Sequence, residues 1–288
     1  MTETISSLAK KIATNFEKNE RVVAGRLLIQ FIKLIDKEKY LAGRNFYAYI
    51  RYLDDVVDEG KNPKKTKVFL RNEIRFLESL KSNDFKISGD TDPYHELVVQ
   101  GLANTDRKKE VIQNLINGIK GFYLDTIAIL YNKPLPEIYQ VKRNSLNLLS
   151  YLEVLSYVLF KRSFSGDRDS EEFDKIISAW AELDALRDYH EDFAAGLVLF
   201  SRRDLKKHKL NLEAGEKVPK EFDSLHKELK IQNIITILKN LGSLNKSTLP
   251  LIFRLTFQLY FLRGISKLAE RKPMGETKII FAQNKLEA

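Results

Sequence analysis

Apolar residues recur at the spacing of an α-helix along nearly all of the 288-residue chain. Residues three and four apart share one face of a helix, so each such segment has a face to bury against a neighbour. No alternating strand pattern of any length interrupts the series. The segments with helical spacing are 26–35, 46–57, 110–130, 145–160, 175–193, 231–241 and 251–270. The sequence therefore predicts an all-α fold of eight or more helices.

The breaks between these segments are polar and short. They include 60–67, 81–96, 132–137, 161–172 and 202–221. None is long enough, or rich enough in Ser and Gly, to be a linker between domains. Since no repeat of fixed period is present either, we expect a single domain over residues 1–288.

The composition excludes several classes of protein. The chain has no cysteine, seven prolines and thirteen glycines, which excludes disulfide frameworks, thiolate metal sites and collagen-like chains. The N-terminus has no signal-peptide pattern, and Glu153, Arg254 and Arg263 interrupt the most apolar stretches. A charge at the centre of a bilayer costs roughly 2.5–3.5 kcal/mol. We therefore expect a cytoplasmic protein without a membrane-spanning helix.

The chain is basic, with 48 Lys and Arg against 39 Asp and Glu and a formal net charge of +9. Such a surplus favours nucleic acid, an acidic surface or a phosphorylated ligand, although a lysine-rich solvated exterior explains it equally well. No arginine-rich tract or zinc-finger spacing is present, so we expect no nucleic acid partner. A phosphorylated ligand and peripheral contact with an anionic membrane surface remain as expectations.

Two acidic patches within apolar segments are the most specific feature. Asp54 and Asp58 are four residues apart, so they stack on one helix face. Asp184, Asp188 and Asp192 form a stripe of three carboxylates over two turns. One acidic pair is ordinarily a solvated face in a chain with 30% charged residues. Two such patches favour a functional site, because aspartate is a poor helix former. Residues that disagree with the local secondary structure are often kept for function.

Carboxylates in this arrangement are suitable ligands for a divalent cation. Mg²⁺ typically takes one or two carboxylates together with phosphate oxygens of a substrate. Arg51 and Arg187 stand beside the two patches and are suited to bind phosphate. The sequence therefore predicts two Asp-rich helices that hold Mg²⁺, or Mn²⁺ in its place, against a diphosphate.

Loss of a diphosphate from carbon leaves a carbocation, which needs an apolar cavity without water. Aromatic faces stabilise such a charge through cation–π contacts. Each aromatic taken singly is more simply explained as ordinary core. The aromatic candidates for lining a cavity are Tyr47, Tyr49, Phe122, Tyr151, Tyr157 and Phe257.

These motifs make the sequence similar to the squalene/phytoene synthase family of trans-isoprenyl diphosphate synthases. Residues 46–59 (FYAYIRYLDDVVDE) look like the first Asp-rich motif of that family, and 186–192 (LRDYHED) look like the second. Between them, 121–125 (GFYLD) resembles the Gly-x-x-x-Asp segment. The resemblance covers about residues 20–280 and rests mainly on the two Asp motifs.

The resemblance implies an isoprenoid synthase helical bundle with a central cavity. Mg²⁺ would bridge the two Asp-rich helices to a prenyl diphosphate, farnesyl or geranylgeranyl diphosphate. Two such molecules would be joined head to head, through a cyclopropylcarbinyl diphosphate, with release of diphosphate. At positions that correspond to the family motifs, the expected metal ligands are Asp54, Asp58, Asp184, Asp188 and Asp192. The expected diphosphate-binding residues are Arg51 and Arg187. The expected catalytic residues are Asp54, Asp58, Asp188, Asp192 and Tyr47.

Several positions depart from the family pattern. Asp184 and Ala181 replace an asparagine and a glutamine, 196–199 (GLVL) lacks the Arg and Tyr of Gly-Arg-x-Tyr, and Tyr157 replaces a glycine. Metal ligands are thus kept while residues that shape the substrate site change. Two alternatives stay open. One is a class I-type terpene cyclase, whose second metal motif has the same i, i+4, i+8 spacing. The other is a non-catalytic relative acting as an assembly or binding protein.

Overall fold

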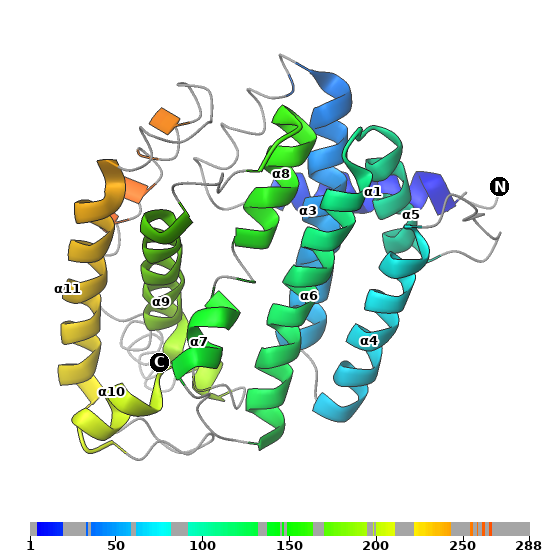
Figure 1. Ribbon diagram of the computed structural model, residues 1–288. Coiled ribbons are helices and arrows are strands. Elements are labelled where there is room, and N and C mark those ends of the chain that lie inside the picture. Colours follow the sequence, from blue (N-terminus) through cyan, green and yellow to red (C-terminus); the bar gives the residue numbers. More distant parts are fainter. Residues whose placement is uncertain are drawn as a thin grey trace, which may run out of the picture.

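The chain forms a bundle of helices, seen in a computed structural model (Figure 1). The described residues are 5–19, 33, 36–58, 62–81, 92–131, 137–144, 146, 149–163, 170–194, 198, 200–210, 222–242, 254, 255, 258, 261, 262, 265 and 266. The helices are α1 (Ile5–Asn19), α3 (Lys37–Asp58), α4 (Pro63–Ser79), α5 (Pro93–Ala103), α6 (Lys108–Tyr131), α7 (Glu137–Asn144), α8 (Ser150–Phe160), α9 (Ser170–Ala194), α10 (Arg202–Lys207) and α11 (Phe222–Asn240). No strand occurs among these residues, and the predicted all-α class is confirmed.

The strongest helical patterns of the sequence lie on observed helices. α3 includes 46–57, α6 includes 110–130 and α9 includes 175–193, while α11 and α8 cover most of 231–241 and 145–160. The other two predicted segments fall largely outside the described residues. None of the helices described has both the length and the apolar character that a bilayer span requires.

The sequence pattern did not reveal helix α4. Its buried positions are Thr66, Leu70, Glu73 and Leu77, spaced four, three and four residues apart. The spacing is helical, but two of the four buried residues are polar, so the apolar periodicity is interrupted. Local signals mark its start instead, because Asn62 accepts hydrogen bonds from backbone N–H groups of the first turn.

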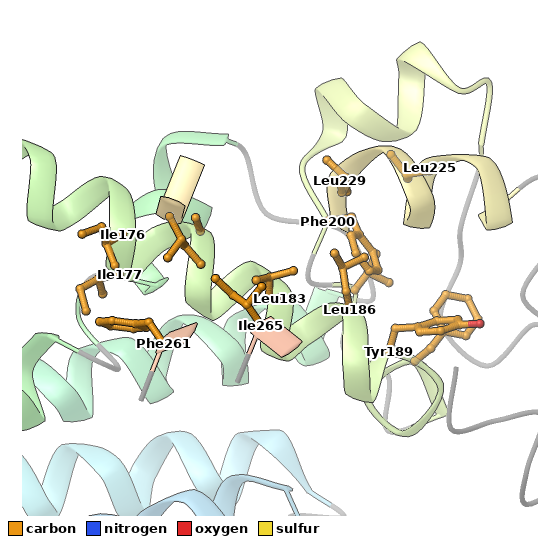
Figure 2. Close-up of a cluster of buried hydrophobic side chains, with 14 of the residues drawn as sticks. Ile176, Ile177, Leu183, Leu186, Tyr189, Phe200, Leu225, Leu229, Phe261 and Ile265 are labelled. Atoms are coloured by element: carbon orange, nitrogen blue, oxygen red, sulfur yellow. The ribbon is translucent and has the colours of Figure 1, made fainter. Parts of the chain in front are cut away.

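Two apolar clusters hold the bundle together. One is formed mainly by α3, α4, α5, α6 and α8. The other joins α9, α10 and α11 and also includes Tyr40 of α3 and Leu152 of α8. Figure 2 shows part of it, with Leu183 of α9 beside Ile265 and Leu186 beside Phe200. Burial of each such side chain contributes about 1.5–3 kcal/mol. The packing between α9 and α11 and between α6 and α8 fixes the helices that carry the acidic residues.

A buried polar network joins α3, α4 and α5. The Glu73 side chain is almost fully buried; its carboxylate accepts a hydrogen bond from Tyr49 Oη at 2.8 Å and lies 3.0 Å from His95 Nε2. Burial, together with the charge of Glu73, raises the pKa of Tyr49 well above its usual value, so the phenol stays protonated and donates. Since buried polar groups need such partners, the network fixes α3 against two neighbouring helices.

Helices α3 and α5 also approach each other closely at a glycine. A Cβ atom at Gly101 would lie 2.7 Å from Cζ of Phe46, which is fully buried. The ring has no free space to enter, because it lies in the cluster formed around α3 and α6. Only a residue without a side chain therefore permits this spacing.

Replacement of this glycine tests the close approach. We expect Gly101→Ala to lower the free energy of unfolding by roughly 1–3 kcal/mol, because overpacking forces side chains and backbone to shift. Urea unfolding followed by circular dichroism measures the change. Gly242→Ala is the matched control, since no heavy atom lies within 4 Å of the Cβ position there. Equal stability of the two variants would contradict the packing argument.

Candidate active site

The last two turns of α3 carry the first acidic patch. Asp54 and Asp58 are separated by one turn, and Arg51 lies one turn before Asp54. The Arg51 guanidinium donates to the Asp54 carboxylate, and its Nη2 lies 3.4 Å from Asp55 Oδ1. Asp54 is 29% exposed, whereas Asp55 is 45% exposed. The side chain that faces the bundle is therefore Asp54.

A third carboxylate, from α6, completes this patch. Asp125 is 5% exposed and its charge acts on both acidic positions of α3. Burial raises the pKa of Asp54 to about 7, helped by the charges of Asp58, Asp125 and Asp55 and opposed by Arg51. Partial desolvation and Asp125 also raise the pKa of Asp58. The Asp54 carboxyl therefore titrates near neutral pH.

Arg143 of α7 is a residue of this site that the sequence did not indicate. Its side chain is 12% exposed, its Nε donates to Asp125 Oδ1, and its Nη2 lies 3.4 Å from Asp125 Oδ2. The two residues are separated by eighteen positions and lie on different helices. No helical spacing relates them, and the packing of α7 against α6 brings them together.

The second acidic helix reaches the same point through Asp192. Burial alone would lower the pKa of Arg143, but the charges of Asp125, Asp192 and Asp54 raise it. Carboxylates from α6, α9 and α3 therefore act on one guanidinium. Helix α7, which carries Arg143, also packs against both α6 and α9.

The other residues of the second patch are placed differently. Asp184 and Arg187 pair at 2.6 Å on α9, with side chains 51% and 38% exposed. Asp188 lies on the same helix between Asp184 and Asp192, but its side chain is outside the described part of the structure. The roles predicted for these residues stay predictions.

Tyr47 lies near Arg51, one turn away on α3. Its ring centroid is 5.6 Å from that of Tyr151 on α8, at an angle of 47°, and its side chain lies close enough to Arg51 to interact with it electrostatically. Tyr47 thus connects the arginine of the first patch to an aromatic pair between α3 and α8. Among the other aromatic candidates, Tyr49 points to Glu73 inside the bundle, while Phe257 is outside the described residues.

Tyr157 is another of the aromatic candidates for lining a cavity. Burial, Glu153 and Glu110 raise its pKa, which places it near the start of α6. Glu110 and Asp125 are fifteen residues apart on this helix, which corresponds to about 22 Å at 1.5 Å per residue. Tyr157 therefore lies far from Asp125 and from the acidic patch at the end of α3.

The donor set matches the chemistry of Mg²⁺, although no preformed cage is present. Within the described ranges no three acidic or histidine side chains form a ready metal cluster, a search that leaves out the Asp188 side chain. Half-buried carboxylates whose pKa values are raised by one another gain from a cation that neutralises them. Mg²⁺ usually keeps only one or two protein carboxylates and takes its other ligands from water and substrate phosphates, so a preformed cluster is not required.

Comparisons with known proteins support the fold. No family model matches the sequence, and no curated protein matches it. A solved dehydrosqualene synthase, crystallised in complex with a ligand, matches with a TM-score of 0.68 and 16% sequence identity. The match covers 92% of this chain and 86% of the other. The predicted isoprenoid synthase fold is therefore confirmed.

The raised pKa of Asp54 predicts a stability that depends on pH. Its folded pKa of about 7 exceeds the ordinary 3.8, so the folded state binds the proton more tightly and ionisation destabilises the protein. We expect Asp54→Asn in metal-free buffer to stabilise the protein at pH 8. The gain should decline as pH falls from about 7 to about 4 and vanish below that. Each pKa unit corresponds to about 1.36 kcal/mol, which partial exposure reduces to a total of about 1–3 kcal/mol.

Thermal unfolding from pH 4 to 8 measures this effect. Asp55→Asn is the control, since this neighbouring carboxylate is more exposed and its ion pair contributes about 0–1 kcal/mol. A destabilised Asp54→Asn protein at pH 8, or a gain that is constant across the range, would show that burial and neighbouring charges do not disfavour the ionised group.

Proposed function

We propose that the chain is a Mg²⁺-dependent prenyltransferase that condenses two prenyl diphosphates head to head and releases diphosphate. The observation that carries the proposal is the position of Arg143 on α7, which packs against α6 and α9: it is paired with Asp125 of α6, and the charges of Asp192 and Asp54 act on it. The likeness of the fold to a dehydrosqualene synthase supports the same reaction class. Farnesyl and geranylgeranyl diphosphate are the proposed substrates.

The proposed metal ligands are Asp54 and Asp58 on α3 and Asp184, Asp188 and Asp192 on α9. Bound Mg²⁺, or Mn²⁺, would supply the positive charge that stabilises a departing diphosphate. The part of the protein is to hold the carboxylates on two packed helices, so that little reorganisation is needed when the ligand arrives.

Arg51 and Arg187 are proposed to bind the diphosphate. Each is paired with an aspartate one turn away on its own helix, Asp54 and Asp184 respectively, and both arginines are partly exposed. Exposed ion pairs contribute only about 0–1 kcal/mol, so turning either guanidinium toward a diphosphate costs little. The planar donor group can then bind two phosphate oxygens at once.

In the proposed reaction the bond between C1 and oxygen of one prenyl diphosphate breaks, and diphosphate leaves with the electron pair. The double bond of the second molecule attacks the allylic cation, and loss of a proton closes a cyclopropylcarbinyl diphosphate. Tyr47 and Tyr151 are proposed to face the cationic carbon, because an aromatic face stabilises positive charge without reacting with it.

Replacing one proposed metal ligand tests the reaction. We expect Asp58→Asn to reduce diphosphate release from farnesyl or geranylgeranyl diphosphate on the order of 100-fold or more, because it weakens binding of the cation that stabilises the departing diphosphate. A coupled diphosphate assay measures the rate, with and without a chelator. Asp106→Asn is the control, since Asp106 is exposed and pairs only with Lys161 among the contacts described, and it should keep the wild-type rate.

The products distinguish the alternatives by mass spectrometry. A product of doubled carbon number supports the proposal, whereas a cyclic product of unchanged carbon number identifies a terpene cyclase. If neither wild type nor the Asp106→Asn control releases diphosphate above background with any prenyl length, the enzyme proposal is refuted in favour of a binding role.

The aromatic contact predicts a separate effect at Tyr47. Tyr47→Phe keeps the ring and should keep kcat within about twofold, whereas Tyr47→Leu removes it. A cation–π contact is worth about 0.5–2 kcal/mol, so we expect kcat of Tyr47→Leu to fall roughly 2- to 30-fold. Steady-state kinetics with both variants measures the difference. A larger loss for Tyr47→Phe would instead assign the role to the hydroxyl group.

A further inference from the structure

Arg143 lies on α7, which packs against the acid-bearing helices α6 and α9, yet it belongs to neither Asp-rich motif. Its side chain is 12% exposed and is bound through two nitrogens to the buried carboxylate of Asp125. The charges of Asp192 and Asp54 act on the same guanidinium, and the charge of Arg143 acts in turn on Asp58. A permanent cation thus stands inside the proposed metal site.

A guanidinium differs from the other cations that this site can hold. Arginine cannot lose its proton in a protein, so its charge is permanent. It also cannot leave the site, because it is covalently part of α7. The positive charge of Arg143 partly neutralises the carboxylates near it. It also repels a divalent cation that enters the site.

We propose that Arg143 is a built-in cation of the acidic site, which holds the carboxylates of α3, α6 and α9 together without metal and weakens their affinity for a free divalent ion. The inference rests on the proposed function, since it takes the carboxylates of α3 and α9 as the metal site. It implies that Mg²⁺ enters together with the diphosphate, because the negative charges of a diphosphate offset the added positive charge.

Metal binding to the purified protein tests this role without any turnover. The probe is Mn²⁺, whose free concentration is followed by electron paramagnetic resonance. We expect Arg143→Met to bind Mn²⁺ at least tenfold more tightly than wild type, which corresponds to about 1.4 kcal/mol. Arg143→Lys keeps the charge and should stay within about threefold of wild type. Arg107→Met is the control, because this exposed arginine pairs with Glu110 at the far end of α6.

Inorganic pyrophosphate supplies a second measurement. Pyrophosphate should increase the affinity for Mn²⁺ more in wild type than in Arg143→Met. Only wild type has the positive charge of Arg143, whose repulsion of Mn²⁺ the negative charge of pyrophosphate offsets. Unchanged or weaker Mn²⁺ binding by Arg143→Met, or the same gain as in Arg107→Met, would overturn the proposal.

Folding of the variant is addressed by a second replacement. Arg143→Met leaves the Asp125 charge buried without its partner, which destabilises proteins by about 3–5 kcal/mol. The double variant Arg143→Met with Asp125→Asn removes both charges and should fold as wild type does. Because its net charge equals that of wild type, its reference is Asp125→Asn alone, which keeps the Arg143 charge, and the double variant should bind Mn²⁺ more tightly than this reference. Equal or weaker Mn²⁺ affinity than that of Asp125→Asn overturns the inference.

The two proposals fail in distinguishable ways. Wild type that releases diphosphate while Arg143→Met shows no gain in Mn²⁺ affinity contradicts only the role of Arg143. Wild type that releases no diphosphate while Arg143→Met gains Mn²⁺ affinity contradicts the enzymatic proposal and supports the built-in cation.

Discussion

Negative charge gathered inside an apolar bundle is the constraint on which the arrangement of this protein depends. Asp125 is nearly buried, and Asp54 is sufficiently desolvated that its pKa reaches about 7. Carboxylates in such a place take up protons, pair with a cation or bind a metal. Arg51 and Arg143 supply part of the balance. The rest of the helical packing keeps the carboxylates close despite their mutual repulsion.

The sequence predicted the elements whose signals are local. Asp54 and Asp58 are four residues apart on one helix, so their common face followed from spacing alone. Arg143 could not be found in this way, because its partner Asp125 lies on another helix and their contact depends on how α7 packs against α6. Helix α4 was missed for a related reason, since its buried Glu73 is satisfied by residues of α3 and α5. Polar residues look exposed until their distant partners are known.

The likeness to a dehydrosqualene synthase at 16% identity has the same physical basis. A bundle tolerates many exchanges of apolar residues when volume and patterning are kept. Two such proteins need to keep the positions of the buried faces along each helix, and different apolar residues can fill these positions. Their structures are therefore similar although their aligned sequences are identical at few positions.

The hydrogen bond from Tyr49 to Glu73 separates an anchored middle part of α3 from a C-terminal turn that this bond does not hold. The middle of the helix is fixed to α4 by this bond and to α5 by the contact between Phe46 and Gly101. Asp58 is the last residue of the helix and lies beyond both anchors. Backbone amides around Tyr49 should therefore exchange their hydrogens only in the largest openings of the protein, whereas the turn with Asp58 can fray alone. A carboxylate on such a turn can adjust to an incoming ligand while the helix behind it stays in place.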